Sequence, residues 1–84
     1  MILTVIRILV MEYRYDTLCS HSPAQIQASP RLRRMLRSLA AYSDSGRWLK
    51  DYEADEQGLL PKWLKRGVLS QDGLYNLLCD ARDS

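Results

Sequence analysis

The chain contains no phenylalanine, and only two cysteines, three prolines and four glycines among its 84 residues. Two cysteines are too few for the disulfide scaffold of a small secreted domain. No apolar run approaches the roughly 20 residues of a membrane-spanning helix, because Arg7 interrupts the apolar start. That start also lacks the basic region of a secretory signal. These absences predict a cytoplasmic protein with reduced thiols and no association with a membrane.

The charges are also nearly balanced, with 12 basic and 10 acidic side chains and a formal net charge of +2. This is well below the charge of a dedicated nucleic-acid binder. The length predicts a single domain over residues 1–84. Because so small a domain buries a modest share of its surface, a second copy, a partner or a metal would add useful stability.

The first 19 residues are rich in β-branched side chains, which permits a strand. However, Ile8, Met11 and Tyr15 recur at the three- and four-residue spacings of an amphipathic helix, and we expect a helix here. Its first turns are apolar on more than one face, which predicts self-association through this helix. The polar residues 20–29 are expected to form a connection.

Ser29 and Pro30 predict the start of the next helix, because serine caps helix N-termini and proline fits the first helical position. A third helix is expected over residues 47–56, with Ser45 as its cap and Gly58 as its stop.

Pro61 is expected to start a short helical turn that Gly67 ends, and Ser70 to cap a last helix with Asp72 in its first turn. The predicted fold class is therefore all-α, a small bundle of about four to five helices joined by short capped turns.

The segment between the two tryptophans is the first candidate binding surface. Its acids alternate before a glycine, as in a calcium loop. If Asp51 were the first ligand, however, the turn glycine of that loop would fall on Glu56 and the bidentate acid on Lys62. We therefore expect no metal and no cofactor. Either both tryptophans anchor the core or one is exposed in a protein interface. The candidate protein-interaction surface comprises Trp48, Asp51, Glu53, Asp55, Glu56 and Trp63.

Two basic groups, one in residues 31–37 and one in residues 62–66, are the alternative candidate site. Arginine suits bidentate contact with phosphate, and two groups on one face would form a basic footprint for nucleic acid. The competing interpretation is an ordinary amphipathic helix whose arginines pair with the acids of 51–56. The candidate nucleic-acid contacts are Arg31, Arg33, Arg34, Arg37, Lys62, Lys65 and Arg66.

No complete set of catalytic groups is visible. The spacing of Cys19 and His21 is not that of a zinc site, and Cys79 lies beside an apolar stripe as a small core residue. A nucleophilic pair of cysteine and histidine would lack an identifiable orienting group. We therefore expect no catalytic residues and no enzyme activity.

Two longer patterns carry a family resemblance. The first, Arg-Ile-x-x-Met-Glu-x-x-Tyr-Asp, begins at Arg7. The second starts at Trp48, continues through Asp-aromatic-Glu-Ala-Asp-Glu, Gly-x-Leu-Pro and Leu-Lys-Arg-Gly-Val-Leu-Ser, and ends with Tyr-Asn-Leu-Leu at 75–78. Together they resemble a family of small bacterial helical proteins catalogued as domain of unknown function 4298. The resemblance implies a helical fold and brings no activity or catalytic residue. Residues 20–30 depart from the family pattern, which usually has a longer charged helix there.

The sequence thus favours a non-enzymatic protein-interaction module that self-associates or binds a protein partner. The alternative is a nucleic-acid-associated regulatory protein that uses the basic helix 31–37.

Overall fold

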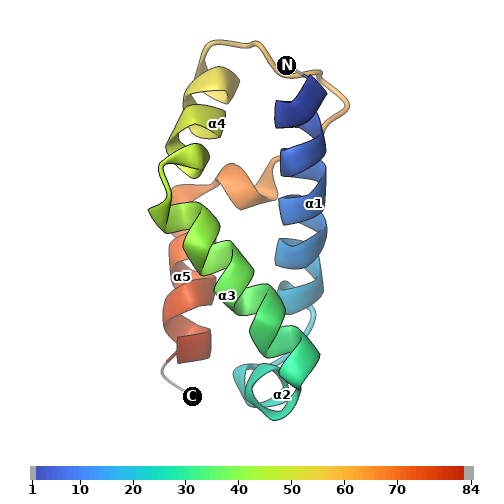
Figure 1. Cartoon of the computed structure of the whole chain (residues 1–84), viewed down its shortest axis with the longest axis vertical. Helices are drawn as coiled ribbons and strands as arrows, with labels where there is room; N and C mark the ends of the chain where they lie inside the picture. Colours follow the sequence, from blue (N-terminus) through green and yellow to red (C-terminus); the bar gives the residue numbers. More distant parts are fainter. Residues whose placement is uncertain (1, 83–84) are drawn as a thin grey trace.

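A computed structural model describes the backbone of residues 2–82 and the side chains of residues 2–80. These residues form an elongated bundle of about 37 × 18 × 17 Å, and no strand occurs within the described range. Figure 1 shows α1 along one side, α4 and α5 along the other, and α3 running obliquely between them. The predicted all-α bundle is confirmed. Its elements are α1 (Ile2–Cys19), α2 (Pro23–Ala28), α3 (Pro30–Asp44), α4 (Arg47–Glu56), the 3-10 turn η1 (Gly67–Leu69) and α5 (Gln71–Arg82).

The core runs along the bundle and draws on almost every element. Ile8 and Leu18 of α1, Ile26 of α2, Leu39 of α3 and Val68 of η1 are each no more than 1% exposed. The spacing of the buried α1 residues follows one face of a helix, so the helix predicted for the start of the chain is confirmed and the strand is wrong.

The turn η1 lies in the middle of the bundle and is held by side chains from two helices. The buried Val68 N–H donates to Glu12 Oε1 of α1 at 2.7 Å, and the Val68 carbonyl accepts from Trp48 Nε1 of α4 at 3.0 Å. A Cβ on Gly67 would lie 3.1 Å from Glu12 Oε2, so this glycine allows the close approach of the turn to α1. Because buried backbone groups need partners, Glu12 and Trp48 make it possible for a short turn to cross the interior.

The connection predicted for residues 20–29 is wrong, because this segment contains α2. Ser22 caps α2 by accepting from the Gln25 N–H, while the Gln25 side chain accepts from the Ser22 N–H, which completes a capping box with Pro23 at the first helical position. This signal is readable in the sequence. The short helix brings Ile26 into the core.

The predicted start of α3 and the predicted bounds of α4 match those observed, and Ser29 caps α3 by accepting from the Leu32 N–H. The N-cap of α4 is Gly46 rather than Ser45, although Ser45 Oγ accepts from the Arg47 N–H at 3.3 Å. A tight reversal between α3 and α4 needs a positive φ, which Gly46 supplies with +84°.

The end of α4 and the start of α5 follow the prediction. Gly58 adopts a φ of +71° just after α4, and Ser70 Oγ accepts from the Gly73 N–H at the start of α5. The helical turn expected at Pro61 is only one hydrogen-bonded turn, from the Leu64 N–H to the Pro61 carbonyl. Gly67 begins η1 instead of ending that turn, because the buried contacts of Val68 place the 3-10 turn there.

Candidate interaction surface

Asp51, a member of the candidate protein-interaction surface, lies in the interior with 1% of its surface exposed. Its carboxylate accepts from Arg7 Nε at 2.9 Å, from Arg7 Nη2 at 2.5 Å and from Tyr42 Oη at 2.6 Å. The hydrogen bond to Asp51 raises the pKa of Arg7, and burial raises the pKa of Tyr42. The structure therefore removes Asp51 from any exposed surface and makes it the link between α1, α3 and α4.

Asp55 is partly exposed and forms an ion pair with Arg66 from the connection before η1. The acids of 51–56 were expected to pair with the arginines of 31–37, but Asp51 and Asp55 pair with Arg7 and Arg66 instead. The reason is tertiary, because the fold brings the Arg7 side chain of α1 to Asp51 and brings Arg66, from the connection that leads into η1, to Asp55.

The two tryptophans have different environments. Trp48 is half-buried, donates to Val68, and stacks on Tyr52 with ring centroids 5.1 Å apart. Trp63 is 70% exposed. Trp48 is therefore a core anchor. Of the candidate surface, Trp63, Glu53 and Glu56 face solvent.

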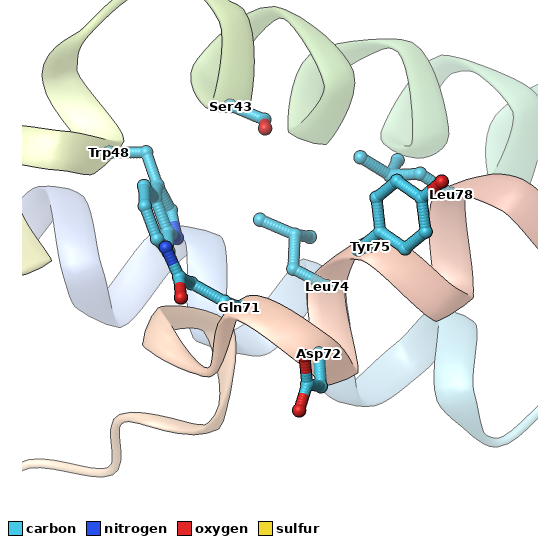
Figure 2. Close-up of a pocket in the computed structure, with 7 residues that line it drawn as sticks. All are labelled: Ser43, Trp48, Gln71, Asp72, Leu74, Tyr75 and Leu78. Carbon is cyan, nitrogen blue, oxygen red and sulfur yellow. The ribbon is translucent and has the colours of Figure 1, made fainter.

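A groove of about 300 Å³ lies where α3, α4 and α5 meet. Figure 2 shows Trp48 at one end of this groove, Tyr75 at the other, and Leu74 between them. The only carboxylate among its lining residues is Asp72, so the groove does not contain a pair of acids for acid–base chemistry. The remaining lining residues are Ser43, Gln71 and Leu78.

The two basic groups lie on different segments of the bundle. The first occupies the first half of α3, and the second lies in the connection between α4 and η1, which Figure 1 shows passing over one end of the bundle and returning to η1 in its middle. Within the first group, Arg31 and Arg34 line one shallow depression together with Arg14 of α1. Arg33 donates to the Gln27 carbonyl.

Cys19 and His21 do not form an activated pair. Desolvation raises the pKa of the Cys19 thiol, which disfavours the nucleophilic thiolate. His21 Nδ1 lies 2.7 Å from the Thr17 carbonyl, so that nitrogen carries a proton and the imidazole is oriented by its own helix end. Within the part of the chain that the structure describes, no three His, Cys, Asp or Glu residues are grouped as metal ligands would be.

Of the ten large hydrophobic side chains that are exposed among the described residues, six lie on the outward face of α1. Six side chains there are between 41 and 74% exposed. Their spacing places all of them in one sector of the helix, opposite the sector that carries Ile8 and Leu18 into the core. We call this outward sector the α1 face; it comprises Ile2, Leu3, Ile6, Leu9, Val10 and Tyr13.

None of the helices in residues 2–82 has both the length and the apolar character required to cross a bilayer. A family model described as domain of unknown function (DUF4298) matches residues 8–84, which confirms the resemblance found in the sequence. Comparison with curated proteins and with solved structures finds no match.

Proposed function

We propose that this chain, which belongs to the family described as domain of unknown function DUF4298, is a non-enzymatic protein-interaction module that works through the α1 face. The observation that carries the proposal is the exposure of six large apolar side chains along one helix. With ordinary side-chain areas, their exposed fractions amount to on the order of 700 Å², larger than the apolar patch of most monomeric proteins.

The interior acids support a role without catalysis. Asp51 accepts three hydrogen bonds from Arg7 and Tyr42, and Glu12 accepts from the Val68 N–H. These carboxylates hold elements of the bundle together. The residues that carry the family resemblance, including Arg7, Glu12 and Asp51, thus have structural roles in this fold.

A capture experiment tests the proposal. Immobilised protein is exposed to a lysate of the native host and, separately, to a second copy of the chain that carries a different tag. We expect capture of protein by the wild type, loss of capture by Leu9→Lys, and retention by Leu49→Lys. Leu49 is a matched control because it is 50% exposed on α4, compared with 45% for Leu9. Equal capture by the two variants would contradict a role for the α1 face.

One observation favours the alternative of nucleic-acid association. Arg14, Arg31 and Arg34 line the same depression, and arginine is the side chain best suited to bidentate contact with a phosphate. If the alternative holds, retention on immobilised RNA or DNA should fall with salt and be lost in Arg31→Gln/Arg34→Gln. Retention that is unchanged in this variant would contradict it.

A further inference from the structure

We infer that the α1 face binds the α1 face of a second copy of this chain, with the two helices antiparallel. This inference rests on the proposed function and names the partner of the same surface. It is carried by the register of the exposed side chains, by the area they expose, and by the charge at the two ends of the stripe.

The register is that of a helix-pairing seam. Ile2, Ile6, Leu9 and Tyr13 follow one another at intervals of four, three and four residues, the alternation that keeps a stripe facing a partner helix. Leu3 and Val10 widen one edge of the seam. In an antiparallel pair centred between Ile6 and Leu9, each Ile6 packs against the partner's Leu9.

The exposed apolar area is sufficient for a specific dimer interface. Two copies that contribute on the order of 700 Å² each would bury about 1,400 Å², within the range of stable interfaces. Ile2, Leu3 and Ile6 lie before residue 8, where the family match begins. Because their side chains stay exposed, the core of the monomer does not account for their apolar character.

The charges favour the antiparallel arrangement. Asp16 is exposed and continues the same stripe three residues beyond Tyr13. In a parallel pair the two Asp16 carboxylates would face each other across the seam. In the antiparallel pair each Asp16 lies beside the first turn of the partner's α1, which contains no acidic residue of its own. A carboxylate is favourable there because the N-terminal end of a helix is electropositive.

Light scattering on the full chain over low to high micromolar concentrations tests whether a dimer forms. We expect the mass of a dimer for the wild type and for Leu49→Lys. Leu9→Lys should raise the dimer dissociation constant about tenfold or more, because each dimer would bury two lysines in its seam. A wild type that stays monomeric at high micromolar concentration would overturn the inference.

Disulfide cross-linking tests the orientation. In a chain with Cys19→Ser and Cys79→Ala, the variants Ile6→Cys and Leu9→Cys are oxidised alone and mixed. We expect the cross-link in the mixture and not in either variant alone. Efficient cross-linking of each variant by itself would show a parallel pair and overturn the antiparallel arrangement. Ala41→Cys, on the exposed side of α3, measures the background from random collision.

The two proposals fail in distinguishable ways. A monomeric chain that captures a host protein, and loses it on Leu9→Lys, would leave the interaction module standing and remove the second copy as its partner. A monomeric chain that captures nothing would overturn both.

Discussion

Replacing Asp51 by asparagine should destabilise the fold strongly, because the carboxylate receives three hydrogen bonds in the interior. Asparagine has nearly the same shape, but its amide nitrogen would oppose a donor from Arg7 or Tyr42. Removing one partner of a fully buried ion pair costs about 3–5 kcal/mol. Arg7 keeps 27% of its side chain exposed, so water solvates part of the orphaned charge. We therefore expect a loss of about 2–3 kcal/mol in the free energy of unfolding.

Urea unfolding followed by circular dichroism measures this loss. For a domain of this size, the same change should lower the melting temperature by about 10 °C or more. Asp55→Asn is the matched control, since it removes one partner of an ion pair in which the side chains are 34 and 26% exposed. This exposed pair should contribute only about 0.5–1 kcal/mol.

A double-mutant cycle isolates the interaction. Arg7→Met keeps the apolar stem of the arginine and removes its charge. Combined with Asp51→Asn, it should give a coupling energy of about 1.5 kcal/mol or more. A coupling energy near zero, or an equal loss from Asp55→Asn and Asp51→Asn, would refute the claim that burial makes the Arg7–Asp51 pair the stronger one.

Three further predictions concern single positions. Burial raises the pKa of Glu12, so the folded state favours the protonated carboxyl, and this stabilisation is lost as the pH rises from below the usual glutamate value through the raised one. The free energy of unfolding of Glu12→Gln minus that of the wild type, measured by urea titration, should therefore be larger at neutral pH than at about pH 4. The opposite trend would show that the hydrogen bond from Val68 to the charged carboxylate dominates. Gly58→Ala should lose about 1 kcal/mol in the same assay because its φ is +71°, while Gly58→Asn should lose less; equal losses would contradict a conformational cause. Ser22→Ala should cost about 1 kcal/mol by removing the capping box of α2, and an unchanged unfolding midpoint would show that α2 does not depend on its cap.

Much of the fold could be predicted because its signals are local. Ser29 and Ser70 mark helix starts, Gly58 marks a helix end, and the apolar spacing of residues 8–18 marks a buried helix face. Each of these signals acts within one or two turns of chain. The sequence also contains a local signal for α2, the capping box of Ser22 and Gln25, so the connection predicted for residues 20–29 is wrong for a reason other than tertiary packing.

The candidate site was less predictable because its environment depends on packing. Asp51 and Glu53 are neighbours in the same acidic segment, yet Asp51 is buried and Glu53 is exposed. Trp48 and Trp63 are equally apolar in the sequence, but only Trp48 reaches η1 and donates to Val68. Composition and spacing do not distinguish such pairs, whereas the packing does: Arg7 and Tyr42 surround Asp51, and η1 reaches Trp48.

The sequence by itself determined the helices, their caps and the excess of apolar residues at the start of the chain, because helix formation depends on neighbours one turn away. Only the tertiary structure decided which charges meet, since Arg7 and Asp51 are 44 residues apart and Glu12 and Val68 are 56 apart. It also decided which apolar side of α1 remains outside. A helix that is apolar on two faces can bury either one, and the arrangement of α3, η1 and α5 against Ile8 and Leu18 leaves the opposite face in solvent.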